Sequence, residues 1–339
     1  MGDPTLTAET LTRWLRGAGT LPRGAVTDVR IELEHETPIS TLVFLTVTYS
    51  AETDASLPRS LVVKWPHIRH ETSEVEFFNQ LAPRMGTPPV VRCLAAIQDF
   101  DTNILVLEDL RASHHHPAWP LPPSPADCER AVATLAQVHA RWWESPMLGH
   151  TIGKLHTHES LTSMVQGIAA HLPAFMDAFG ASLTVEARKT YEKVFSSALK
   201  PWLRLTDEHA LTIIHGDAHT WNFLFPRSGE GEAFVIDWQL WHVDVGARDL
   251  AFLIALHWYP STRRELEQSL LRLYHEVLLT QGVENYSFEE LWLDYRRGAV
   301  RNLTMPIIFW NQGMSLERWW SRLECALASY RDLDCEELL

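Results

Sequence analysis

A proline-rich stretch between residues 111 and 125 divides this chain into two parts of different character. It holds five of the 19 prolines, and because proline fixes its own φ and lacks an N–H donor, neither a helix nor a strand continues through it. The part before it alternates apolar and polar residues, which predicts strands over 26–34, 41–49, 60–65, 90–98 and 103–108, with helices over 7–17 and 70–81. The part after it has apolar residues at helical spacing over 127–144, 157–178, 184–205, 262–281 and 287–301, with a strand-rich insert at 211–241. We therefore expect an α+β fold, with a small antiparallel sheet first and a mainly helical region second.

Composition and charge exclude several classes of partner. The 339 residues include 29 Lys and Arg against 43 Asp and Glu, a net charge of −14, whereas nucleic-acid binding needs a basic surface. No run approaches the roughly 18 apolar residues of a membrane span, and the first residues lack the pattern of a secretory signal. The four cysteines form no C-x-x-C pair, which predicts free thiols in a reducing compartment. We expect a cytoplasmic protein without nucleic-acid or membrane partners, and the sequence does not indicate an oligomeric state.

The most informative segment is a polar loop inside the strand-rich insert. An apolar run ends at Ile214, the loop then presents Asp217, and Asn222 follows five positions later, at the start of the next apolar run. Asp237 ends a third apolar run, fifteen positions after Asn222. Because a hairpin joins the second and third runs, its open end is expected to bring Asn222 and Asp237 together, with Asp217 close by.

Three oxygen-bearing side chains at one point suit phosphoryl transfer. Mg²⁺ prefers hard oxygen ligands and bridges the phosphates of a nucleotide, which predicts Asn222 and Asp237 as metal ligands. A separate carboxylate that does not bind the metal can accept the proton of an attacking hydroxyl, which predicts Asp217 as the catalytic base. A neutral Asn beside an anionic Asp is compatible with a metal that arrives as a nucleotide complex.

The same residues resemble the catalytic loop of the aminoglycoside phosphotransferase and choline kinase-like superfamily, which has a protein-kinase-like fold. The superfamily pattern is H-G-D-x-H-x-x-N, followed by an apolar strand that ends in I-D-W or I-D-F. The matching residues of this chain are His215, Gly216, Asp217, His219 and Asn222, then Ile236, Asp237 and Trp238. Asp249-Leu250-Ala251 is similar to a D-L-A segment of the superfamily, and the Ile-Asp-Trp-Gln ending is closest to the ecdysteroid kinase-like subgroup.

This resemblance implies a two-lobed fold and an activity. It implies a nucleotide-binding lobe over 1–109 and a helical lobe over 110–339 that carries the catalytic loop and the acceptor pocket, with ATP in the cleft between them. The implied reaction transfers the γ-phosphoryl group of ATP to a hydroxyl of a small molecule, such as an antibiotic or another metabolite. His215 is expected to brace the catalytic loop, and His219 to support Asp217 or Asp237.

A lysine on a predicted strand completes the expected nucleotide site. Lys64 lies in an apolar run, and a kinase-like site needs a cation on the nucleotide phosphates that a carboxylate orients. Glu74, on the following helix, lies three and four positions before Phe77 and Phe78 and shares their inward face. It is therefore the expected partner of Lys64, with Glu71, one turn earlier, as the alternative.

Two further segments are assigned through the resemblance. Residues 35–41, between the first two strands, hold no glycine, so close backbone approach to a phosphate is not provided there. Ser40 and Thr41 are expected to donate hydrogen bonds to phosphates instead. The stretch that ends at Leu110 resembles the hinge where adenine meets backbone groups, which makes Glu108 and Leu110 candidate nucleotide contacts. Glu108 can equally be an ordinary charge at a strand end.

Several alternatives stay open at this point. Four tryptophans of the C-terminal helices either line the acceptor pocket or pack in the core: Trp292, Trp310, Trp319 and Trp320. The run His114–His116 either binds a metal or belongs to a solvated connector. A peptide Ser/Thr kinase of natural-product maturation fits the same motifs. A nucleotide-binding pseudokinase also fits, because the phosphate loop lacks glycine.

Overall fold

The computed structural model describes residues 6–37, 39–67, 74–85, 89–98, 103–118, 123–197, 200–207 and 209–339. The chain forms two compact units. Unit 1 comprises Met1–His116 and Leu224–Leu240, and unit 2 comprises Pro117–Phe223 and Trp241–Leu339. The expected division into 1–109 and 110–339 assigns functions to two lobes and stays a prediction. The compact units have different bounds because part of the strand-rich insert packs with the N-terminal segment.

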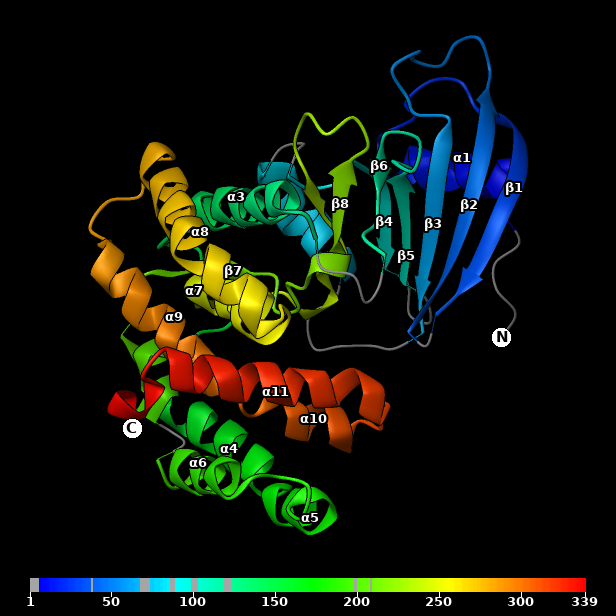
Figure 1. The fold of residues 1–339 in the computed structure, drawn as a ribbon. Helices are drawn as coiled ribbons and strands as arrows, with labels where there is room; N and C mark the ends of the chain where they lie inside the picture. The colour runs from blue at the N-terminus through cyan, green and yellow to red at the C-terminus, as the bar shows by residue number, and fades with distance from the viewer. Residues whose placement is uncertain are drawn as a thin grey trace. The chain divides into compact units, whose positions relative to one another are not determined.

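Unit 1 is built on a five-stranded antiparallel sheet in the order β1-β2-β3-β5-β4 (Figure 1). The strands are β1 Val26–Glu36, β2 Ser40–Tyr49, β3 Ser60–Pro66, β4 Cys93–Gln98 and β5 Asn103–Glu108. Each lies close to a predicted run, because alternating apolar and β-branched residues mark half-buried strands directly. The predicted small antiparallel sheet is therefore confirmed.

Helix α1, Ala8–Gly17, packs on this sheet as its pattern predicts. Thr7 caps the helix, since its side chain accepts a hydrogen bond from the N–H of Thr10 at 3.1 Å. Leu11 and Leu15 are fully buried and join the apolar core of the sheet. Burial of such a side chain contributes about 1.5–3 kcal/mol, so α1 holds the sheet on which Lys64 lies.

Residues 74–81 of the helix predicted over 70–81 are helical, and residues 70–73 lie outside the described residues. Helix α2, Glu74–Glu76, continues into a π-helical turn, Phe77–Leu81. Glu74 and Val75 are buried, as are Phe77 and Phe78 of the next turn. The inward face predicted for Glu74 is therefore confirmed. Glu71 lies outside the described residues.

A second sheet of unit 1 joins segments that are far apart in the sequence. Its order is β6-β8-β9, with β6 His114–His115, β8 Phe223–Pro226 and β9 Phe234–Val235. Strands β8 and β9 form the hairpin expected within the insert. Strand β6 was not predicted: His115 pairs with Phe225, and the ring of His114 meets the ring of Phe234 edge-on, with centroids 5.0 Å apart. His114 and His115 are therefore half-buried residues of a sheet and not part of a solvated connector, whereas His116 is exposed and follows the strand.

Unit 2 is mainly helical, as predicted (Figure 1). Its helices are α3 Pro125–Trp142, α4 His158–Ala169, α5 Leu172–Phe179, α6 Val185–Ser196, α7 Ala247–Leu250, α8 Pro260–Thr280, α9 Phe288–Asn302, α10 Met305–Asn311 and α11 Leu316–Asp332. Strands β7 Leu211–Ile214 and β10 His242–Val245 pair antiparallel. The helices predicted over 157–178 and 184–205 are each interrupted, because Pro173 and Pro201 open new helical segments. Within the described ranges, no helix is long and apolar enough to cross a membrane.

The core of unit 2 forms around a buried π-helical segment, Ala251–Leu256. All six of its residues are at most 2% exposed. Helix α9 approaches this segment closely at Gly298, where an added Cβ would lie 2.6 Å from the Cβ of Ala251. A larger residue at position 298 would push α9 away, so glycine is required for this packing.

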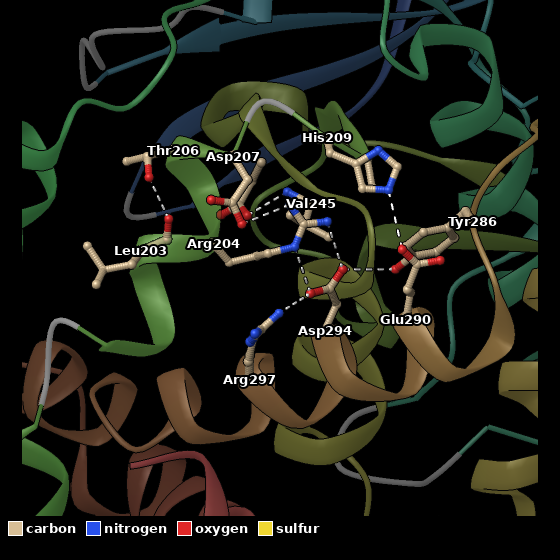
Figure 2. A network of polar contacts seen from close by, with 12 residues as sticks. Leu203, Arg204, Thr206, Asp207, His209, Val245, Tyr286, Glu290, Asp294 and Arg297 are labelled. Carbon is tan, nitrogen blue, oxygen red and sulfur yellow. Dashed lines mark hydrogen bonds and ion pairs between the residues drawn. The ribbon is translucent and has the colours of Figure 1, made fainter.

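A polar network in unit 2 joins the 3₁₀ turn Lys200–Thr206 to α9 (Figure 2). Asp294 is 5% exposed and accepts hydrogen bonds from Arg204 at 3.2 Å and Arg297 at 3.0 Å. The hydroxyl of Tyr286 donates to the same carboxylate at 3.2 Å. Burial raises the pKa of Tyr286 well above its ordinary value, so the phenol keeps its proton. The buried carboxylate is thus compensated by two guanidinium groups and one hydroxyl.

Candidate active site

Most of the residues predicted to act on a nucleotide form two groups, one in each unit. The first group is the Lys64 cluster, which consists of Lys64, Glu74 and Asp237. The second group is the catalytic loop, His215–Asn222, which follows β7. Each group is described within its own unit.

Lys64 forms two short ion pairs on β3. Its Nζ lies 2.6 Å from Oε2 of Glu74 and 2.6 Å from Oδ1 of Asp237. Lys64 is 7% exposed and Glu74 4% exposed. The pair that the sequence predicts between Lys64 and Glu74 is therefore present in unit 1, and Asp237 joins it from the end of the β8–β9 hairpin.

The charges of the Lys64 cluster depend on one another. Burial acts against the charged form of Lys64, but the attraction of Glu74 and then of Asp237 outweighs it and raises the pKa of the lysine. Burial raises the pKa of Glu74, and this outweighs the opposing attraction of Lys64. Lys64 therefore stays a cation through the neutral pH range, between two acidic side chains.

The backbone around Asp237 turns sharply and is held from two sides. Asp237 has a φ of +69°, in the left-handed region that residues with a Cβ rarely adopt. The N–H of Trp238 donates to Oε1 of Glu74 at 3.3 Å. The indole of Trp238 stacks on Phe77, with centroids 4.0 Å apart and an angle of 9°. These contacts fix the strained turn next to Lys64, as is common where a side chain must be placed for function.

Ser40 and Thr41, the predicted phosphate donors, hold the turn between β1 and β2. Thr41 Oγ1 donates to Oε1 of Glu36 at 2.9 Å and lies 2.7 Å from Nε2 of His67. Ser40 Oγ lies 3.1 Å from Oγ1 of Thr37. Donation from either hydroxyl to a phosphate would replace one of these bonds, and it stays a prediction.

Glu108 and Leu110, the predicted adenine contacts, flank the end of β5. The N–H of Glu108 donates to the carbonyl of Arg92 at 3.0 Å. The carbonyl of Leu110 accepts from the N–H groups of Ser113 at 3.0 Å and His114 at 2.8 Å. Leu110 thus closes the turn that leads into β6, and a contact of either residue with adenine stays a prediction.

In unit 2 the catalytic loop is anchored by Asp249 of α7. The backbone N–H of His215 donates to Oδ2 of Asp249 at 2.7 Å, and that of Gly216 donates to Oδ1 at 3.1 Å. Gly216 has a φ of +82°, where only glycine is free of strain. Asp249 is 1% exposed. One buried carboxylate therefore fixes the backbone immediately before Asp217.

Asp249 is in turn held by His139 of α3. Nε2 of His139 lies 3.3 Å from Oδ2 of Asp249, and Nδ1 lies 2.8 Å from the hydroxyl of Tyr274. Burial by itself raises the pKa of the Asp249 carboxyl, but the hydrogen bond and charge of His139 outweigh it and lower that pKa. His139 is fully buried, as the sequence indicates for a packed helix residue. The anchoring role of Asp249 was not predicted, although the D-L-A segment marks its position.

Three side chains surround Asp217 within the loop. Nδ1 of His215 accepts a hydrogen bond from the N–H of Asp217 at 3.2 Å, the kind of contact that a bracing role requires. Nε2 of His219 lies 3.5 Å from Oδ2 of Asp217. The amide of Asn222 donates to the backbone carbonyl of Asp217 at 2.9 Å and to its Oδ2 at 3.4 Å. The Asp217 side chain is 26% exposed, so its carboxylate is partly open to solvent.

The donor atoms of both groups suit Mg²⁺. Nδ2 of Asn222 is engaged with Asp217, which leaves the carboxamide oxygen Oδ1 as the atom able to accept a cation. The Lys64 cluster holds two carboxyl groups against one ammonium group, so a bound cation would balance its charge. Hard oxygen donors of this kind are those that Mg²⁺ prefers.

Comparison with solved structures shows the fold. Over 98% of this chain and 99% of the other, the structure is similar to a protein from Ralstonia eutropha described as an aminoglycoside phosphotransferase (TM-score 0.59, 14% identity). It is also similar to choline kinase from Cryptosporidium parvum (TM-score 0.54, 10% identity, 91% and 89% of the two chains). A third similar structure is amicoumacin kinase hAmiN in complex with AMP-PNP, Ca²⁺ and Ami (TM-score 0.52, 13% identity, 98% and 96% of the two chains). The predicted protein-kinase-like fold is therefore confirmed.

Comparison of sequences shows the family. Curated protein sequences give no significant match. The model of the ecdysteroid kinase-like family matches residues 39–284, more than two thirds of the chain. This range includes Lys64, the catalytic loop and Asp249. The chain belongs to the ecdysteroid kinase-like family.

Proposed function

We propose that this protein is an ATP-dependent phosphotransferase that moves the γ-phosphoryl group of ATP to a hydroxyl of a small molecule. The observation that carries the proposal is the position of Lys64 between Glu74 and Asp237. A buried lysine that stays charged and is oriented by a carboxylate is what nucleotide phosphates require. Proteins of the same fold support it, since one is named a choline kinase and another an amicoumacin kinase solved with AMP-PNP.

In the proposed reaction, Asp217 accepts the proton of the acceptor hydroxyl as that oxygen attacks the γ-phosphorus. The bond from the γ-phosphorus to the β,γ-bridging oxygen breaks, and ADP leaves with the electron pair. Lys64 neutralises charge on the α- and β-phosphates. His215 and Asn222 hold the Asp217 backbone in place through the contacts at 3.2 Å and 2.9 Å.

The remaining predicted contacts complete the proposed nucleotide site. Asn222 and Asp237 would hold Mg²⁺, which when bound neutralises phosphate charge. Ser40 and Thr41 would donate to phosphates, and the segment that includes Glu108 and Leu110 would meet adenine. The acceptor is an antibiotic or another metabolite. All four cysteines are free thiols, which supports a cytoplasmic site of action.

An ATP-consumption screen with Mg²⁺, over hydroxylated metabolites and antibiotics, tests this function. Asp217→Asn should lower turnover on any acceptor found by about 10²- to 10⁴-fold. Asp207→Asn, which changes an exposed carboxylate elsewhere in unit 2, is the matched control and should stay near wild type. Retained turnover in Asp217→Asn would show that Asp217 is not the base. Absence of both turnover and Mg²⁺–nucleotide binding would favour a pseudokinase.

A further inference from the structure

Among the residues that the structure describes, the half-buried guanidinium of Arg322 on α11 has no carboxylate partner. Its Nη1 donates to the hydroxyl of Ser321 at 3.1 Å, and it forms no ion pair with any described residue. Three other enclosed guanidinium groups of unit 2 differ, because Arg204, Arg263 and Arg301 each pair with Asp or Glu. Arg248 instead donates to the side-chain oxygen of Asn302 at 2.8 Å. Burial lowers the pKa of Arg322. A partly desolvated cation of this kind gains strongly from an anionic partner.

A chain of contacts links Arg322 to the proposed base. The guanidinium carbon of Arg322 lies over the ring of Trp221, 5.5 Å from its centroid. The ring of Trp221 lies 5.7 Å from that of His219, which is 3.5 Å from Asp217. Trp221 is itself part of the catalytic loop and precedes Asn222. Arg322 is therefore linked to the catalytic loop through Trp221, and all of these residues belong to unit 2.

The neighbouring histidine adds no charge at this place. The ring of His257 lies 5.4 Å from His219 and 6.4 Å from Trp221. Burial, and then the charges of Arg322 and His219, lower the pKa of His257 well below its ordinary value. His257 is therefore neutral at physiological pH, and Arg322 supplies the positive charge beside Trp221.

We propose that Arg322 and Trp221 form an acceptor subsite that binds an anionic oxygen group joined to an apolar or aromatic body. This inference rests on the proposed function, because Arg322 is linked to the proposed base Asp217 through Trp221 and His219. The guanidinium offers parallel N–H donors to a carboxylate or phosphate, and the indole offers an apolar face. A cationic acceptor would be repelled by Arg322.

Calorimetric titration of the full chain with three matched probes tests the subsite. The probes are 2-naphthoate, 2-naphthamide and 2-naphthylmethylammonium, which share a ring and differ in charge. Wild type should bind naphthoate about tenfold more tightly than the amide and the ammonium least, and added salt should reduce this preference. Arg322→Gln should bring the naphthoate Kd to that of the amide. Arg331→Gln, which removes an equal charge from an exposed position on the same helix, should leave the preference unchanged.

Two results would overturn the subsite. One is a wild type without preference for the anion, and the other is Arg322→Gln with the preference intact. A nucleotide phosphate is the other source of an anion, so ADP with Mg²⁺ is titrated in parallel. An unchanged ADP Kd in Arg322→Gln supports the acceptor assignment. A higher ADP Kd in this variant would overturn it and assign Arg322 to the nucleotide site.

The test of the subsite can be distinguished from a failure to fold and from a failure of the proposed function. If Arg322→Gln does not fold, Arg322→Lys decides: it should keep a reduced anion preference, and complete loss or full retention in a folded protein would contradict the guanidinium role. Probe binding needs no phosphoryl transfer, so it can be found in an inactive protein. Efficient transfer to cationic acceptors would overturn the subsite and leave the proposed function standing.

Discussion

Asp249 accepts a hydrogen bond from the backbone N–H of His215 at 2.7 Å, so a buried carboxylate on α7 sets the position of the catalytic loop. Asn at position 249 would keep one acceptor oxygen but lose the charge that holds His139 and the second N–H. We expect Asp249→Asn to lower the free energy of unfolding by about 1.5–3 kcal/mol and to lower kcat. Urea denaturation and steady-state kinetics measure the two effects, with Asp207→Asn as the control. A variant with wild-type stability and kcat would show that the loop does not depend on Asp249.

Removal of the Lys64 charge should weaken nucleotide binding. Lys64→Met leaves the Glu74 and Asp237 carboxyl groups without their cation, and we expect ADP with Mg²⁺ to bind at least about tenfold more weakly. The same change should lower the free energy of unfolding by about 3–5 kcal/mol, because a buried ion pair loses one partner. Fluorescence titration with a labelled ADP gives the affinity, and circular dichroism shows whether the variant is folded.

Glu74→Gln provides a second variant with less effect on folding, and Lys189→Gln, at an exposed position, provides the matched control. Glu74→Gln should weaken ADP binding less than Lys64→Met, since Gln can still meet Lys64 and the N–H of Trp238. Equal ADP affinity in wild type and a folded Lys64→Met protein would contradict the role of the lysine.

The stack of Trp238 on Phe77 should stabilise unit 1. Trp238 is fully buried, and its Nε1–H donates to the carbonyl of Val235 at 3.2 Å. Trp238→Ala should cost about 3–5 kcal/mol through the cavity it creates. Trp238→Phe keeps an aromatic ring and should lower the free energy of unfolding by less. It loses one hydrogen bond, worth about 1 kcal/mol, and some buried apolar area. Chemical denaturation of both variants tests the ranking, and equal costs would count against a specific stacking role.

Stability should depend on pH through Asp244, whose carboxylate lies 2.6 Å from Nη2 of Arg301. Burial alone would raise the pKa of Asp244, but the charge of Arg301 outweighs it and lowers that pKa well below the ordinary range. Because the folded pKa lies below the unfolded value of about 3.9, this stabilisation is complete above that value and is lost as pH falls through the folded pKa.

Asp244→Asn is the variant that isolates this effect. The difference in unfolding free energy between wild type and the variant should shrink as the pH falls below about 4. Urea denaturation at several pH values from about 5 downward measures it. A difference that grows below about pH 4 would contradict the assignment.

The sequence predicted the elements whose signals are local. Thr7 marks the start of α1, and the apolar alternation of β2 and β3 places Lys64 on a strand between buried residues. The spacing of the apolar runs around the loop predicts Asp217, Asn222 and Asp237, and the resemblance to the superfamily pattern supports the same residues. The partnership of Lys64 with Glu74 follows from the helical spacing of Glu74 relative to Phe77.

The features that could not be predicted from the sequence depend on contacts between residues that are far apart in the chain. Strand β6 forms within a proline-rich stretch because His115 meets Phe225, more than a hundred positions away, and no local pattern signals such a pair. Asp249 accepts the backbone hydrogen bond of His215 because the fold brings α7 next to the catalytic loop, and the periodicity of the sequence does not reveal this contact. The absence of a carboxylate partner for Arg322 within the described ranges became visible only when its neighbours were placed.

The most direct test of the account follows the γ-phosphoryl group itself. Phosphorus NMR of ATP, Mg²⁺ and an acceptor from the screen should show a phosphomonoester signal that grows as ATP is lost, in wild type and Asp207→Asn but not in Asp217→Asn. Release of inorganic phosphate at the same rate with and without the acceptor, or the same ester formed by Asp217→Asn, would contradict it.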